Sequence, residues 1–540
     1  MAMTKIGAAW FGAVVLMPLA ATAQGQQPQV EVFAPVAATV TPNLRDLPTV
    51  AAWQPGDPIK EVPRRSTHIP KPVPPPTPMI DPLVALQQGR RQPEVLGPPT
   101  LNINGGGFSG VNPPDTVGDV GDTQYVQMIN FSSGSQIRVY DKAGVLVSGP
   151  TALDSLGTGN CANGLGDPVV LWDQQAHRWL LSEFSSAGNR LCVYVSQTAN
   201  AMGSYFAYQF TALNFPDYPK YGVWPDGYYV GTNENNPAVY ALQRSAMLTG
   251  AAALSQRFVA LPELSGFGFQ MLPPADWDGA AAPPAGAPAV FVRHKDSEAH
   301  GSPGAADTIE LFAFHVDFAT PANSTLTGPT GIAVAEFDSD MCGLNNFSCV
   351  PQPGGGGLLD PVQQPIMHRA QYRNRGTHEA IVASFTVDTT GTNVAGVRWF
   401  ELRKVAAGPW TLFQEGTQAP DTTNRWMSSL AMDGTGNMAL GYNVSSSSVF
   451  PGIRYTGRLS TDLGGTMGAE QVAIAGTVSN GSTRYGDYSS LNVDPVNDCD
   501  FWLTGMFNTA SQWATRITKF RFPAGECIDV PVELMEFSIQ

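Results

Sequence analysis

A hairpin pattern recurs seven times along this chain, and it constrains the fold more than any other feature. In each copy a short strand enters a turn of Asp, Gly or Asn, and an aromatic or aliphatic strand follows. The copies lie about 50–60 residues apart, or about 100 where an insertion intervenes. They end at Asn130, span 166–184 and 221–233, end at His294, and span 368–385, 425–443 and 484–507. Strand repeats of this length predict an all-β fold, a seven-bladed β-propeller of four-stranded antiparallel blades.

Composition agrees with many short strands. Charged residues make up only 14% of the chain, which contains 56 Gly and 45 Pro, as expected for strands joined by turns. The formal net charge of −15 disfavours nucleic acid and anionic membrane surfaces as partners. It is compatible with bound cations and with neutral or cationic ligands.

The N-terminus has the pattern of an export signal. Residues 1–5 carry positive charge, 6–19 are apolar, and Ala21-Thr22-Ala23 fits a small-x-small cleavage site. We therefore expect a signal peptide at 1–23 and a secreted, periplasmic or cell-surface protein. No second stretch of the sequence is long and apolar enough for a membrane span.

The rest of the chain divides into three parts. Residues 24–100 are rich in Pro, Ala and Gln, and we interpret them as a Pro-rich, mostly extended linker with little core of its own. The propeller is expected at 101–525 and a C-terminal tail at 526–540, which could pair as an edge strand or act as a sorting tag. Two insertions, 280–288 and the loop that contains 354–357, are expected on a rim, where loops can cover a site.

Export favours oxidation of the six cysteines. Proximity in sequence predicts the pairs Cys161–Cys192, Cys342–Cys349 and Cys499–Cys527. A metal site is disfavoured, because no Cys-x-x-Cys pair or nearby His completes a ligand set.

Motifs in the last repeats resemble a known family. They include RYTGR at 454–458, GDYSS at 486–490 and the segment 424–443. The chain is similar over about 107–527 to secreted bacterial β-propeller proteins of unassigned function. Arg375 departs from the family pattern, in which an aromatic residue is common there. The resemblance implies the fold and export, and it implies no activity.

Polar residues at the starts of the predicted first strands are the candidate site. In a propeller these strands line a central channel, so the residues before them should converge on one mouth of the channel. Lys220, Asp276 and His368 belong to this set. The ten candidate ligand-binding residues are Asp115, Asp167, Arg369, Gln371, Tyr372, Arg425, Trp426, Arg484, Asp487 and Tyr488.

These residue types allow two interpretations. Arginines can clamp carboxylates, aromatic rings can stack on sugars, and paired carboxylates can act as acid and base. A repeated Asp before a strand can instead serve only to accept backbone N–H groups. Thr377, His378 and Glu379 fall at a hairpin that we expect away from this mouth, so we do not assign them to catalysis.

Two functions therefore remain open. One is a protein that binds an extracellular glycan, another polymer or a protein ligand at the channel mouth. The other is a carbohydrate-active enzyme, a glycoside hydrolase or polysaccharide lyase, that uses the same site. The sequence lacks the sialidase Ser-x-Asp-x-Gly-x-x-Trp box, a P-loop and a Gly-x-Ser-x-Gly elbow, so no catalytic residue is predicted. The acidic loops 115–122 and 494–500 could bind calcium.

Overall fold

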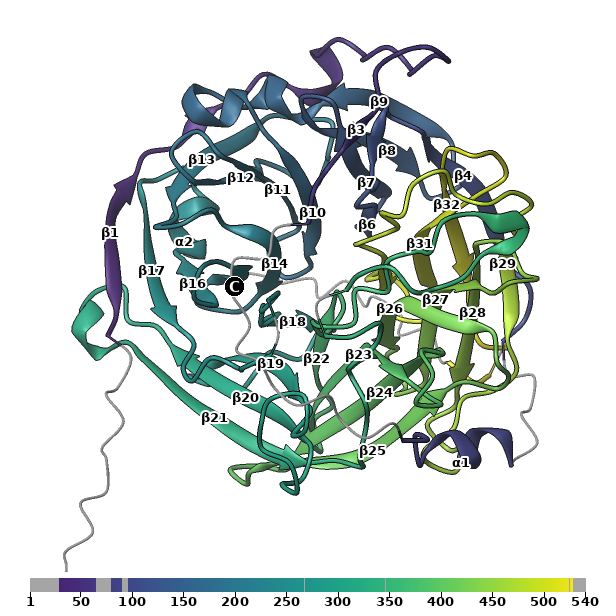
Figure 1. Ribbon diagram of the computed structural model, residues 1–540. Coiled ribbons are helices and arrows are strands. Elements are labelled where there is room, and N and C mark those ends of the chain that lie inside the picture. Colours follow the sequence, from purple (N-terminus) through teal and green to yellow (C-terminus); the bar gives the residue numbers. More distant parts are fainter. Residues whose placement is uncertain are drawn as a thin grey trace, which may run out of the picture.

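The computed structural model describes residues 29–64, 79–89, 96–266, 268–344, 346–523 and 525–527. Within them the chain forms seven mainly four-stranded antiparallel blades in a ring, which confirms the predicted β-propeller (Figure 1). The predicted signal peptide and nearly all of the predicted tail lie outside the described residues. None of the described helices is long and apolar enough to cross a bilayer. The helices are α1 (Val84–Gln88), α2 (Arg244–Met247) and 3-10 turns at Leu44–Asp46, Leu153–Leu156, Gly159–Ala162, Pro321–Asn323 and Pro353–Gly355.

Blades 1 to 3 are regular, and in each a tight turn joins the inner strand to the next one. Blade 1 consists of β6 (Val117–Val120), β7 (Gln124–Phe131), β8 (Gly134–Asp141) and β9 (Leu146–Ala152). Blade 2 consists of β10 (Gly166–Asp173), β11 (Arg178–Ser185), β12 (Arg190–Ser196) and β13 (Tyr205–Thr211). Blade 3 consists of β14 (Asp217–Val223), β15 (Tyr228–Asn233), β16 (Ala238–Leu242) and β17 (Ala253–Val259).

Blade 4 departs from the repeat. Its outer strands β19 (Ala289–Lys295), β20 (Thr308–His315) and β21 (Thr325–Ala333) form a three-stranded sheet. Its inner strand β18 (Ala275–Asp278) pairs in parallel with the inner strand of blade 5. Blade 5 consists of β22 (Ala370–Asn374), β23 (Glu379–Asp388), β24 (Ala395–Lys404) and β25 (Trp410–Gln418). Blades 4 and 5 are therefore joined by backbone hydrogen bonds near the axis.

The first strand of the ring completes its last blade. Blade 6 consists of β26 (Asn424–Met432), β27 (Met438–Ser445), β28 (Gly452–Arg458) and β29 (Gln471–Ile474). Blade 7 consists of β30 (Ser490–Val493), β31 (Phe501–Phe507), β32 (Ala514–Phe520) and β4 (Leu101–Gly107). The antiparallel pairing of β4 with β32 closes the ring and covers the outer edge of β32.

Polar side chains also link neighbouring inner strands. Asp119 of blade 1 accepts the N–H of Trp172 in blade 2 at 2.7 Å. Gln371 of blade 5 accepts the N–H of Met432 in blade 6 at 2.6 Å. The hydroxyl of Ser490 in blade 7 accepts the N–H of Gly118 in blade 1 at 2.8 Å. Buried polar side chains near the axis therefore have a structural role between blades.

Part of the segment before the propeller pairs with the blades. Its strand β1 (Glu31–Val36) adds to β17, and β2 (Thr39–Val40) adds to β13, so the segment follows the outside of the ring (Figure 1). Further on, β3 (Lys60–Glu61) pairs in parallel with β5 (Val111–Asn112). Leu44 and Leu96 are buried. β1 and β2 are therefore edge strands of blades 3 and 2. We call residues 29–64 the N-terminal strap.

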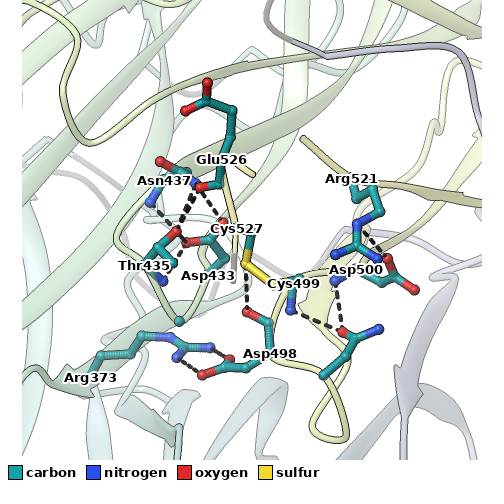
Figure 2. Close-up of a disulfide and its surroundings, with 12 residues drawn as sticks. Arg373, Asp433, Thr435, Asn437, Asp498, Cys499, Asp500, Arg521, Glu526 and Cys527 are labelled. Carbon is teal, nitrogen blue, oxygen red and sulfur yellow. Dashed lines mark hydrogen bonds and ion pairs between the residues drawn. A yellow bond between two sulfur atoms is a disulfide. The ribbon is translucent and has the colours of Figure 1, made fainter. Parts of the chain in front are cut away.

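The three predicted disulfides are confirmed: Cys161–Cys192, Cys342–Cys349 and Cys499–Cys527. Figure 2 shows the last of them, where the chain returns over the turns of blades 6 and 7. The carbonyl of Glu526 accepts from the side-chain amide of Asn437 at 2.7 Å. Arg373 of blade 5 donates two hydrogen bonds to Asp498 beside the disulfide, at 2.9 and 2.5 Å. These contacts connect blades 5, 6 and 7 at one end of the axis.

Candidate functional site

Five of the ten predicted residues meet at the channel entrance, the end of the axis where the inner strands begin. The Tyr488 hydroxyl donates to Asp167 at 2.7 Å. Arg484 donates to Asp487 at 2.5 Å. Lys220 places its Nζ 3.1 Å from the centre of the Tyr488 ring. We call Asp115, Asp167, Lys220, Arg484, Asp487 and Tyr488 the axial cluster.

The axial cluster is closed to solvent. Asp115 is 2% exposed, Lys220 1% and Tyr488 1%. Burial raises the pKa of Asp115 well above its usual value, and the charges of Asp167 and Asp487 raise it further. Burial lowers the pKa of Lys220 well below its usual value, against the effect of the neighbouring aspartates. The described residues of the channel entrance therefore form a charged site with little surface exposed to a ligand.

The aspartates of the cluster have a repeated backbone conformation. Asp115, Asp167 and Asp487 have φ of 46°, 53° and 62°, and Tyr218 and Met427 have left-handed values at the same place in their blades. Asp tolerates this region better than most side chains. The side chain of Asn130 donates to Asp115 at 2.8 Å and accepts the N–H of Asp167 at 3.0 Å. These contacts support a structural role for both aspartates at the start of their blades.

The other five predicted residues have partners outside the axial cluster. Arg369 forms ion pairs with Asp276, at 2.7 Å, and with Asp278. Gln371 donates to Asp278 at 2.6 Å. Because side chains alternate along a strand, Tyr372 lies on the opposite face of β22 from Gln371, with its ring 4.7 Å from that of Trp224.

Arg425 and Trp426 also have structural partners. Arg425, whose side chain is fully buried, pairs with Glu470 at 2.7 Å and with Asp421 at 2.9 Å. Trp426 is buried in the core, with its ring centre 5.4 Å from that of Tyr485. Neither side chain is available to a ligand at the channel entrance.

A cleft between blades 4 and 5 is open to solvent. It consists of two cavities of about 460 and 330 Å³, which share Ala287, Glu379 and Lys404 as lining residues. The larger cavity lies between the insertion 284–287 and the hairpin loops after β22 and β24. The smaller lies between β19–β21 and Trp410 at the start of β25. The hairpins place this cleft at the opposite end of the blades from the axial cluster.

The cleft combines polar groups with an apolar wall. Glu379 is buried and accepts from the Tyr372 hydroxyl at 2.8 Å and from the Lys404 ammonium at 3.0 Å. Asn374 and His378 line the larger cavity. Trp410, Val290 and Leu311 line the smaller one. Such a cleft can take an elongated ligand that presents both apolar faces and hydroxyl groups.

Sequence reasoning missed most of this cleft. It expected the insertion 280–288 on a rim and the 377–379 hairpin away from the channel mouth, but it did not bring them together. The available signal was Glu379 and Lys404 at the ends of neighbouring strands, where cross-strand pairing makes them partners.

Two aspartates of the loop 494–500, which was proposed for calcium, already have cationic partners. Asp494 pairs with Lys142 at 2.7 Å, and Asp500 lies 3.5 Å from Arg521. A further group, Asp296, Glu298 and Asp307, could surround an ion by distance. However, Asp307 accepts the N–H groups of Ser297 and Phe337 at 2.8 and 2.7 Å, which accounts for its position without a metal. Calcium binding stays a prediction.

Comparison with known proteins does not assign the chain to a family. No family model matches the chain, and no curated protein matches it, so the resemblance seen in the sequence stays a prediction. Among solved structures, an ulvan lyase from a new polysaccharide lyase family is 9% identical at a TM-score of 0.39, over 80% of this chain and 96% of that one. An exo-β-1,3-galactanase from Clostridium thermocellum is 11% identical at 0.28, over 79% and 100%. The WD40 domain of SCAP from fission yeast is 10% identical at 0.32, over 78% and 97%. Likenesses this weak carry no argument about function.

Proposed function

We propose that the protein binds a neutral extracellular glycan in the cleft between blades 4 and 5. The observation that carries the proposal is the Trp410 wall next to the hydrogen-bonding groups of Glu379, Lys404 and Asn374. An indole face packs against the apolar face of a sugar ring, while carboxylate, ammonium and amide groups bond its hydroxyls. Three disulfides favour an oxidising compartment, where such a polymer would be met.

The charge of the cleft favours a neutral ligand over an acidic one. Lys404 is paired with Glu379 at 3.0 Å, so the two charges largely cancel for an approaching sugar. The chain as a whole carries a formal net charge of −15, which repels polyanions. An uronic-acid or sulfated polymer would find no unpaired cation among the described lining residues.

The same residues favour binding over hydrolysis. Glycoside hydrolysis generally needs two carboxyl groups across the scissile bond. Glu379 is the one carboxylate among the described residues that line the two cavities. The sequence-based alternative, an enzyme at the channel mouth, would require the closed axial cluster to open.

A glycan array with three proteins tests the proposal. Trp410→Ala should weaken binding about tenfold, or about 1.4 kcal/mol, because the stacking surface is lost. Phe413→Ala is the matched control, since Phe413 is an exposed aromatic residue on the same strand and outside the cleft. If the unsubstituted protein and the two variants bind glycans equally well, the cleft is not the glycan site. Turnover of a bound glycan that His378→Ala abolishes would favour the enzyme instead.

A further inference from the structure

Arg64, at the end of the N-terminal strap, covers the axial cluster. Its Nε donates to Asp360 at 3.1 Å, and a second guanidinium nitrogen bonds the same carboxylate. The guanidinium also lies 3.6 Å from Asp487. Its carbon is 4.3 Å from the ring centre of Phe347 and 5.0 Å from that of Phe269. Two carboxylates and two aromatic rings form a complete environment for a guanidinium group.

The residues before Arg64 are held in the manner of a bound peptide. The N–H of Lys60 donates to the carbonyl of Gly110 at 2.8 Å, and that of Val62 to the carbonyl of Asn112 at 2.7 Å. Arg484 of the axial cluster donates to the carbonyl of Val62 at 2.9 Å. Main-chain bonds along a strand edge, with a side chain in a pocket, are a common mode of peptide recognition.

The site beneath Arg64 has an excess of acidic groups. Asp115, Asp167, Asp360 and Asp487 face Lys220 and Arg484 from the propeller itself. One oxygen of Asp115 has no hydrogen-bond partner among the described residues. Without Arg64, four buried carboxylates among the described residues would be matched by two described cations, Lys220 and Arg484. Buried charge is costly without a partner, so the vacant site would favour either a bound cation or protonation of these carboxylates.

We propose that the channel entrance is a receptor site for the arginine of an extended peptide, and that the strap fills it in cis. The ligand class is an arginine-bearing segment of a protein partner that adds a strand beside β5. Binding such a segment requires residues 60–64 of the strap to leave. This site is separate from the proposed glycan cleft, so either can fail without the other.

Binding of a free guanidinium compound in the vacated pocket tests whether the site recognises an arginine side chain. The full-length variant Arg64→Ala is titrated with arginine amide and with citrulline amide, its uncharged analogue. Arginine amide should raise the melting temperature of this variant, and citrulline amide should not. Arg45→Ala is the matched control, because Arg45 lies in the same strap and makes an exposed hydrogen bond to Met202. An equal response of the two variants to arginine amide would overturn the proposal.

A separate peptide tests whether an extended segment can bind beside β5. Val62→Pro combined with Arg64→Ala removes the N–H donated to Asn112 and the guanidinium together. The peptide of residues 59–64 should bind this variant about tenfold more tightly than its Arg-to-Gln version, a difference of about 1.4 kcal/mol. Equal affinities, or no binding by either peptide, would refute the peptide receptor. If the double variant does not fold, the arginine amide titration of Arg64→Ala decides.

Discussion

Replacing Asp81 with Ala tests whether the segment before the propeller contributes to its stability. Asp81 lies outside the predicted propeller, yet its carboxylate is fully buried against blade 5. It accepts from Arg398 at 2.8 Å and from the Thr417 hydroxyl at 2.9 Å. Its second oxygen accepts the N–H of Leu83 at 2.8 Å.

The expected loss in the free energy of unfolding depends on the partners that Arg398 keeps after the substitution. Removing one partner of a buried ion pair costs about 3–5 kcal/mol, because the other charge stays buried. Arg398 retains Glu415 at 3.1 Å and donates to the carbonyls of Ala335 and Glu336. We therefore expect the low end of this range, a loss of about 3 kcal/mol in the free energy of unfolding.

Denaturant unfolding of Asp81→Ala and Asp46→Ala measures the effect. Asp46 is the control, because it is an acidic residue of the same segment whose side chain accepts from Asn43 at the surface. Its replacement should change stability by no more than about 0.5 kcal/mol. If the two variants unfold at the same denaturant concentration, the contacts of Asp81 do not stabilise the propeller and the reasoning fails.

Three further predictions concern acid, disulfides and calcium. Burial lowers the pKa of His294 to about 4, so the neutral side chain's contribution to folding stability is present above pH 6.5 and is lost as pH falls towards 4. His294→Gln should therefore lessen the acid-induced loss of stability by up to about 3 kcal/mol. An unchanged dependence of stability on pH would contradict this. Replacing both cysteines of Cys161–Cys192, which are 31 residues apart, by Ser should lower the free energy of unfolding by about 3.7 kcal/mol. The same change at Cys342–Cys349, which are 7 residues apart, should lower it by about 2.4 kcal/mol, because the closed loop is shorter. If the Cys342–Cys349 variant had the lower melting temperature, the chain-entropy account would be refuted. If the loops 115–122 or 494–500 bind calcium, calcium should raise the melting temperature of chelator-treated protein, and no rise would end that prediction.

Local patterns in the sequence predicted much of the ring. The turns between first and second strands depend on nearby Asp, Gly and Asn, and the disulfides join cysteines that are close in sequence. The parallel pairing of β18 with β22 could not be read in this way, because its two strands are separated by most of blade 4. That residues 31–36 form a strand could not be predicted from local sequence either, because this strand depends on pairing with the edge of β17.

The candidate site was predictable only in part. Asp115, Asp167, Arg484, Asp487 and Tyr488 meet because each stands at the start of an inner strand. Arg369 and Arg425 were expected with them, but each found a closer acidic partner in Asp276 and Glu470. Closure of the entrance by Arg64 depends on a segment that sequence reasoning treated as separate from the domain.

The pairing of β4 with β32 also sets the order in which the molecule can be completed. Thr100, just before β4, is hydrogen-bonded to Lys519, 419 positions later. During synthesis the early strand must therefore wait for almost the whole chain before it finds its partner. A nascent or truncated chain would carry an exposed sheet edge that chaperones and proteases can recognise. The ring thus provides a check on chain integrity, because only a product that reaches blade 7 can pair β4 with β32.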